Sequence, residues 1–217
     1  MMLPWRMDES AWEAKDDVKG GPLELRAVMD ARETEMKYVH GRKVYKYSTR
    51  SECRRITGKG PIRVRWVDTQ KGDLVRARLV AMEFRLKCET AIFAGTPPLE
   101  SLRILVRLAA EAMEDVDPIC LLNLDVSRAH FYAKAKRKVF VELPAEDPMS
   151  ADPEACGELL YSMYGTRDAA SNWEEEYSEY FASLGYKKGV DCPCHFYNKE
   201  EDVRVLVHGD DFLAAGT

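Results

Sequence analysis

Three aspartates follow runs of apolar residues and could together perform metal-assisted chemistry. Asp125 lies at the end of the apolar run 119–126, and Asp210 and Asp211 occupy a turn after the apolar run 203–207. Carboxylates on neighbouring strands repel one another unless cations lie between them. Two divalent ions about 3.5–4 Å apart, bridged by such carboxylates, are the usual apparatus for transferring phosphoryl or nucleotidyl groups. Hard oxygen ligands with open coordination positions suit Mg2+, so the three aspartates predict a magnesium site.

Each aspartate also has a plainer interpretation. Asp210 and Asp211 are favourable turn residues, and Asp125 suits the end of a strand. A second candidate metal site, Cys192-Pro193-Cys194-His195, lacks the paired C-x2-C spacing of structural zinc sites. Free thiols are therefore the preferred interpretation of the six cysteines.

A basic segment could bind the phosphates of a polyanion. Residues 37–87 contain 15 Lys or Arg and only 4 Asp or Glu, although the whole chain carries a net charge of −5. An imbalance of this kind is an electrostatic footprint for nucleic acid. A solvated basic face is the alternative interpretation.

The elements that would position these residues follow from hydrophobic spacing. Alternation over 62–67, the turn 71–73 and a returning strand over 74–82 predict a basic β-hairpin. Thr96 is expected to cap a helix that runs to about residue 112. The other predicted elements are helices over 23–38 and 169–184 and strands over 119–126, 139–143, 195–198, 203–208 and 212–215.

This order of helices and strands predicts an α+β fold with a mainly antiparallel sheet. The 217 residues suit one domain or two small subdomains. Residues 1–22 lack periodicity and are predicted to be a disordered N-terminal extension. No stretch approaches the ~20 apolar residues of a membrane span, and no signal-peptide core is visible. We therefore expect an intracellular protein, in the cytoplasm or the nucleus, without a membrane partner.

Five stretches, taken in order, form a joint motif. They are RWVDTQKGDLVRARLVAMEF (65–84), TPPLESLRILVRLAA (96–110), LLNLDVSRAHFYAKAKRKVFVELPAED (121–147), MYGTRDAASNWEEEYSEYFASLGY (163–186) and VLVHGDDFLAAGT (205–217). Together they resemble the reverse transcriptase domain in the Pol polyproteins of copia-type long-terminal-repeat retrotransposons. The resemblance covers roughly residues 23–217 and ends just after a Y-x-D-D-like hairpin.

The resemblance implies a right-hand polymerase fold. Its fingers would span about 62–95, and its palm about 96–217 with interleaved fingers segments. The thumb, the ribonuclease H and the integrase of such a polyprotein would be missing from this chain. A fragment without a thumb is expected to be inactive alone, because nothing holds the primer 3′-end within attack distance of the nucleotide.

The resemblance also assigns the three aspartates. Asp125 and Asp210 would hold two Mg2+ ions, for which Mn2+ could substitute, and Asp211 would be the supporting carboxylate. By strand alternation, Asp211 is expected on the opposite face from the other two unless the turn re-aims it, nearby but less central. The chemistry would be in-line attack of a primer 3′-hydroxyl on the α-phosphate of a deoxynucleoside triphosphate, copied from an RNA template.

Further site residues carry over from the same stretches. Lys71, Arg76 and Arg78 of the hairpin would meet the triphosphate, with template-backbone contact as the alternative for the arginines. The resemblance places either His130 or Phe131 under the nucleotide sugar. It places three residues beside the template strand, namely Tyr164, Gly165 and Arg167.

Three departures from the family pattern stand out. His208 replaces the usual Tyr of the hairpin, and His130 replaces the usual Phe that packs under the sugar. Thr166-Arg167-Asp168 replaces Leu-Lys-Gln beside the template, which removes an amide and adds a negative charge.

The resemblance therefore predicts a nucleotidyltransferase, an RNA-directed DNA polymerase whose partners are an RNA template and a DNA primer. A non-catalytic retrotransposon remnant that only binds nucleic acid is the alternative. An unrelated metal-dependent hydrolase that uses the same aspartates is the weakest reading, since no residue is evident that would activate water.

Overall fold

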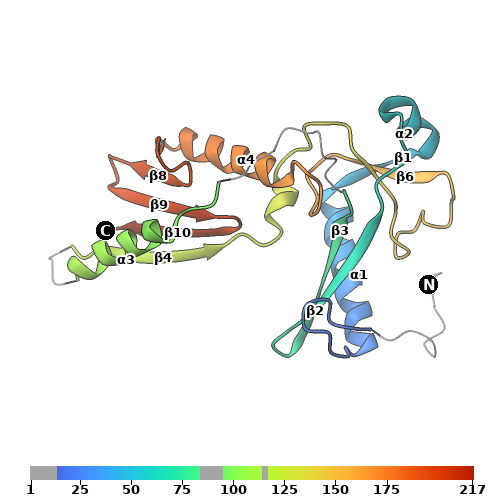
Figure 1. The fold of residues 1–217 in the computed structure, drawn as a ribbon, viewed down its shortest axis with the longest axis horizontal. Coiled ribbons are helices and arrows are strands. Elements are labelled where there is room, and N and C mark those ends of the chain that lie inside the picture. The colour runs from blue at the N-terminus through green and yellow to red at the C-terminus, as the bar shows by residue number, and fades with distance from the viewer. Residues whose placement is uncertain (1–13, 84–94, 114–116) are drawn as a thin grey trace. The chain divides into compact units, whose positions relative to one another are not determined.

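The computed structural model describes residues 14–83, 95–113 and 117–217, which divide into two compact units (Figure 1). Met1–Glu89 and Lys134–Ala169 belong to the first, which we call the hairpin unit. Thr90–Ala133 and Ala170–Thr217 belong to the second, which we call the aspartate unit. Each unit is therefore assembled from two separate stretches of chain.

The hairpin unit contains two antiparallel sheets and two helices. One sheet pairs β2 with β3, and the other has the strand order β1-β6-β5. The elements are α1 (Leu25–Arg42), β1 (Tyr45–Thr49), α2 (Arg50–Thr57), β2 (Val64–Lys71), β3 (Leu74–Ala81), β5 (Phe140–Val141) and β6 (Ala155–Leu159).

Alternation along β3 decides which face of the β2–β3 hairpin is buried. Ala77, Leu79 and Ala81 are almost fully buried on the side against which α1 packs. Arg76 and Arg78, between them, lie on the opposite face because successive side chains of a strand alternate. The predicted basic hairpin is confirmed, with β2 beginning at Val64 and extending to the turn.

A charged link ties α1 to this hairpin. The Arg32 guanidinium on α1 pairs with Asp68 of β2 at 2.5 Å and with Glu146 at 3.1 Å. It also lies over the ring of Trp66, whose indole N–H donates to Glu146. These ion pairs therefore join α1, β2 and the segment that follows β5, to which Glu146 belongs.

Residues 14–22, which the sequence analysis assigned to the N-terminal extension, form a turn that hydrogen-bonds to β2. The carboxylate of Asp17 accepts from the backbone N–H of Asp68, and that of Asp16 accepts from the backbone N–H of Gln70, both at 2.7 Å. Hydrogen bonds from the backbone of Gln70 and Lys19 lower the pKa of Asp16. Residues 1–13 lie outside the described part of the chain.

The aspartate unit is built on a sheet of strand order β4-β10-β9-β8-β7. Its elements are α3 (Leu99–Glu111), β4 (Cys120–Asp125), the 3-10 helix η1 (Ala129–Tyr132), α4 (Ala169–Ser183), β7 (Lys187–Lys188), β8 (His195–Asn198), β9 (Val203–His208) and β10 (Asp211–Gly216). The cap predicted for α3 is wrong, because the residue before the helix is Pro98, not Thr96, and it makes no side-chain cap.

The two longer helices cover opposite faces of this sheet (Figure 1). Trp173 and Tyr177 of α4 pack against Val205, Val207 and Phe212. On the other face, Leu105 of α3 packs against Leu206 and Ala215. The buried residues of β9 alternate between the two clusters, as expected of a strand buried on both faces.

All strand ladders in the described ranges are antiparallel, and helices and strands are mixed. The predicted α+β class is therefore confirmed. The division of the chain into fingers and palm stays a prediction. Among the described helices, none has the length and apolarity that crossing a membrane requires.

Candidate functional site

Strand pairing in the aspartate unit brings the three aspartates together. β10 pairs with both β4 and β9, so the turn between β9 and β10 lies next to the end of β4. Asp125 lies directly opposite Asp211 in the β4–β10 register. The backbone N–H of Val126 donates to the Asp210 carbonyl at 2.9 Å and extends the ladder into the turn. Residues that are about 85 positions apart in sequence thus meet at one corner of the sheet.

The register changes the expected role of Asp211. Directly opposed residues of an antiparallel pair point to the same face, with Cβ atoms about 4.5–5.5 Å apart. Asp125 and Asp211 therefore share a face, and the expectation that Asp211 points to the opposite face is wrong. Both are exposed, while Asp210, in the turn, is half-buried.

A tryptophan supports the turn that carries Asp210. The Trp173 indole N–H donates to the Gly209 carbonyl at 2.8 Å, and Gly209 has a φ of +67°. The Trp173 ring also packs edge-on against Phe212 at 6.1 Å. The sequence does not reveal this role of Trp173, because hydrophobic periodicity says nothing of a bond to a distant turn.

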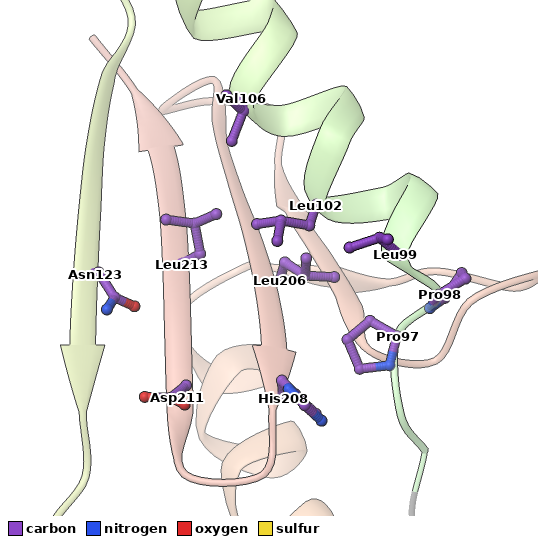
Figure 2. A pocket seen from close by; sticks show the side chains of 10 residues that line it. All are labelled: Pro97, Pro98, Leu99, Leu102, Val106, Asn123, Leu206, His208, Asp211 and Leu213. Atoms are coloured by element: carbon purple, nitrogen blue, oxygen red, sulfur yellow. The ribbon is translucent and has the colours of Figure 1, made fainter.

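A cavity lies on the same face of the sheet as Asp211 (Figure 2). Its volume is about 660 Å³. His208 and Asp211 lie at one end of it, where β9 turns into β10, and Asn123 of β4 lies farther along the sheet, opposite Leu213. The remaining lining residues are apolar: Pro97, Pro98, Leu99, Leu102, Val106, Leu206 and Leu213. The carboxylate of Asp211 thus borders both the open corner of the sheet and an apolar cavity beneath α3.

The donor set fits a magnesium ion that arrives with a substrate. Among the described residues, no three acidic, histidine or cysteine side chains are gathered as a ready-made metal cage. Mg2+ is usually held by one or two carboxylates together with water and substrate phosphates. Asp125 and Asp211 on one face, beside Asp210, supply carboxylates of that kind.

The two candidates for the sugar contact differ in exposure. Phe131, in η1, is completely buried, whereas its neighbour His130 is half-buried. A ring without exposed surface cannot pack against a nucleotide in this conformation. His130 is accordingly the residue of the pair that remains accessible.

In the hairpin unit, the predicted triphosphate residues share one face. Lys71 lies opposite Leu74 in the β2–β3 register, and Leu74 alternates in phase with Arg76 and Arg78. Lys71, Arg76 and Arg78 therefore all point away from α1. We call this surface the basic face. Its arginines are half-buried, and Lys71 is exposed.

The predicted template residues dock beside that face. The Tyr164 carbonyl accepts from the Ala81 N–H at 2.7 Å, which joins the loop 163–168 to the end of β3. The Arg78 guanidinium lies over the Tyr164 ring, 5.1 Å from its centroid. A guanidinium over an aromatic ring is attracted to the face of that ring and still carries N–H donors that suit phosphate oxygens.

Gly165 is required by this docking. Its φ is +81°, and a Cβ at this position would lie 2.0 Å from the Ala81 carbonyl oxygen. The backbone of the loop therefore approaches β3 as closely as only glycine permits.

Arg167 is engaged by a carboxylate that the sequence analysis did not single out. Its Nε donates to Glu83 at 3.0 Å, and Glu83 is also bound by Arg137. Nothing in the local sequence indicates these pairs, because their members are separated by 84 and 54 positions.

Comparison with known proteins identifies the family of this chain. A family model described as "Reverse transcriptase (RNA-dependent DNA polymerase)" matches residues 50–217. The chain belongs to this reverse transcriptase family.

A retrotransposon relative matches almost the whole chain. It is the retrovirus-related Pol polyprotein from transposon TNT 1-94 of Nicotiana tabacum, which is 26% identical over 221 residues. The match covers 96% of this chain and 16% of the relative. The chain thus spans about a sixth of the length of that polyprotein. The two matches together confirm the predicted resemblance to a retrotransposon Pol reverse transcriptase.

Proposed function

We propose that this chain carries fingers and palm of a retrotransposon reverse transcriptase, and that the enzyme to which they belong adds deoxynucleotides to a DNA primer on an RNA template by two-metal nucleotidyl transfer. The β4–β10 register carries the proposal, because it brings Asp125 and Asp211 to one face beside Asp210. Membership of the reverse transcriptase family supports the choice of polymerisation over hydrolysis.

The three aspartates would hold the metal ions. Asp125 and Asp210, with Asp211 on the same face as Asp125, offer the oxygen ligands that Mg2+ or Mn2+ takes. When bound, the ions would supply charge neutralisation at the α-phosphate and at the pyrophosphate leaving group. The exposed position of Asp125 and Asp211 leaves their carboxylates open to a primer end and a triphosphate.

The basic face would bind phosphates. Arg76 and Arg78 offer planar guanidinium groups that match phosphate oxygens in pairs, and Lys71 adds a point charge at the end of the hairpin. Tyr164 lies under Arg78 and helps to hold that guanidinium at the basic face. Half-buried His130 is the residue that would contact the nucleotide sugar.

Template-directed retention of a nucleotide tests the function. The chain is bound to an RNA–DNA template–primer labelled with a fluorophore and is challenged with unlabelled competitor. A reverse transcriptase should release the hybrid more slowly when Mg2+ and the complementary deoxynucleoside triphosphate are present, and not with a non-complementary one. Equal release with all four nucleotides would contradict the proposal and favour a remnant that only binds nucleic acid. Hydrolysis of the triphosphate without template would favour a hydrolase.

The basic face leads to a prediction about salt. Changing Arg76 and Arg78 together to Ala should weaken binding of the hybrid and flatten the plot of log K against log salt concentration. Each lost phosphate contact should reduce the slope by roughly 0.7–0.9, because fewer counterions are released. The measurement is fluorescence anisotropy at several salt concentrations.

The matched control removes two exposed positive charges elsewhere in the basic segment. Arg54 and Lys59 lie in and just after α2, outside the β2–β3 hairpin. Changing both to Ala should leave the slope nearly as it is. If the two double variants flatten the slope equally, general charge rather than the basic face governs binding.

A further inference from the structure

Four charged side chains fasten the loop 163–168 to the end of β3. We call Glu83, Arg137, Arg167 and Asp168 the Glu83 network. Glu83 accepts from Arg137 Nη1 at 2.8 Å, from Arg167 Nε at 3.0 Å and from the Arg167 backbone N–H at 2.9 Å. Arg137 Nη2 also donates to Asp168 at 2.9 Å. One carboxylate thus joins β3, the approach to β5 and the loop.

The network is shielded and charge-balanced. The carboxylate side chains of Glu83 and Asp168 are each only 12% exposed. Burial would raise the pKa of Glu83, but hydrogen bonds from Arg137 and from the Arg167 backbone outweigh it and leave the pKa lowered. Glu83 is therefore ionised at neutral pH. The formal charges of two guanidinium groups and two carboxylates cancel.

The network adjoins the basic face. Tyr164, in the same loop, lies under Arg78, so a polynucleotide bound to the basic face would lie next to the loop. Arg137 and Arg167 would each add a phosphate contact there if they were not committed to carboxylates. The negative charge that Asp168 brings is likewise compensated, because Arg137 binds it.

Resting on the polymerase function proposed above, we propose that Glu83 is a positioning residue for the template strand. It pairs with Arg137 and Arg167, holds both guanidinium groups away from the phosphates, and fixes the loop against β3. The loop then contacts the template through its main chain and Tyr164. Phosphate contacts hold a strand whatever its sequence, and a polymerase must let its template advance by one position after each addition. A neutral loop beside a basic face permits that movement.

Glu83→Gln tests the proposal because the amide keeps the size of the side chain and removes its charge. The variant should bind an RNA–DNA hybrid more tightly, and the slope of log K against log salt should steepen by roughly 0.7–1.8, equivalent to one or two added phosphate contacts. Preference for the complementary nucleotide should fall. A carboxylate that merely stabilised the loop would give weaker binding without a steeper slope. That result, or an unchanged slope, would overturn the proposal.

Two further variants separate the position of the released charge from its amount. Glu52→Gln removes a carboxylate that pairs with Arg55 on α2 at 2.5 Å, in the same unit but away from the loop. This control should leave the slope unchanged, and an equal steepening would overturn the proposal. Glu83→Gln combined with Arg167→Gln should return the slope toward that of the unchanged protein by about one contact.

Arg167→Gln keeps the proposal testable if Glu83→Gln does not fold. Arg167 is held by Glu83 and does not reach phosphate, so its substitution should leave the salt slope unchanged. A slope flattened by about one contact would overturn the proposal. These slopes report binding alone. They remain measurable if the unchanged protein shows no preference for the complementary nucleotide, which is the outcome that contradicts the polymerase function itself.

Discussion

Changing Asp125 to Asn should lower the affinity for Mg2+ by roughly 100-fold or more. The Mg2+-dependent retention of the complementary nucleotide should then be abolished. Loss of a residue that only supports a metal ligand typically costs 10–100-fold in metal affinity, and loss of a ligand should cost at least as much. Substitution of Asp125 is expected to have the largest effect of the three, because Asp125 can pair with either of the other two aspartates. The family resemblance couples it with Asp210, and the strand register sets it opposite Asp211.

Comparison of Asp210→Asn with Asp211→Asn distinguishes the two pairs. If the shared face decides, Asp211→Asn should approach Asp125→Asn in effect. If the turn re-aims its first carboxylate toward the ions, Asp210→Asn should do so. Asp191→Asn is the control, since it removes an exposed carboxylate from the same unit outside the β9–β10 turn. Retention that survives Asp125→Asn would contradict the two-metal proposal. The measurement is competitor-induced release of the labelled hybrid.

Much of the fold was predictable because strands and helices record burial in their spacing. The alternation of β3 follows from one face packing on α1, and the apolar run of β9 follows from helices on both faces. The pairing of β1 with β6 was not predicted. β1 has the sequence Tyr-Lys-Tyr-Ser-Thr and exposes most of its residues, so no apolar pattern marks it. β6 contains Gly157, which allows Tyr45 of β1 to pack closely over it.

The candidate site was predictable to a different degree in its two parts. The three aspartates are visible because charges beside apolar runs are unusual, and the hairpin arginines because they alternate with buried residues. The register that sets Asp211 opposite Asp125 depends on long-range pairing, which local alternation does not determine. The same holds for Trp173 and Glu83, whose partners are distant in sequence.

Gly165→Ala should destabilise the hairpin unit by about 3 kcal/mol and detach the loop 163–168 from β3. A non-glycine residue at positive φ costs roughly 1–2 kcal/mol. An atom forced into a packed site adds roughly 1–3 kcal/mol. Both costs arise here, since φ is +81° and the added Cβ would lie 2.0 Å from the Ala81 carbonyl oxygen and 2.7 Å from Val80 Cγ1. The measurement is the free energy of unfolding in urea.

Gly72→Ala is the matched control for the backbone term. Gly72 has a φ of +61° in the β2–β3 turn, and a Cβ there would meet nothing within 4 Å. This variant should therefore lose only the roughly 1–2 kcal/mol of left-handed strain. The difference between the two variants measures the close approach of the loop to β3. Equal destabilisation by the two substitutions would mean that the loop does not dock as described. If Gly165→Ala lowers the free energy of unfolding more than Gly72→Ala does, it should also lose the preference for the complementary nucleotide. The reason is that Tyr164 would no longer lie under Arg78.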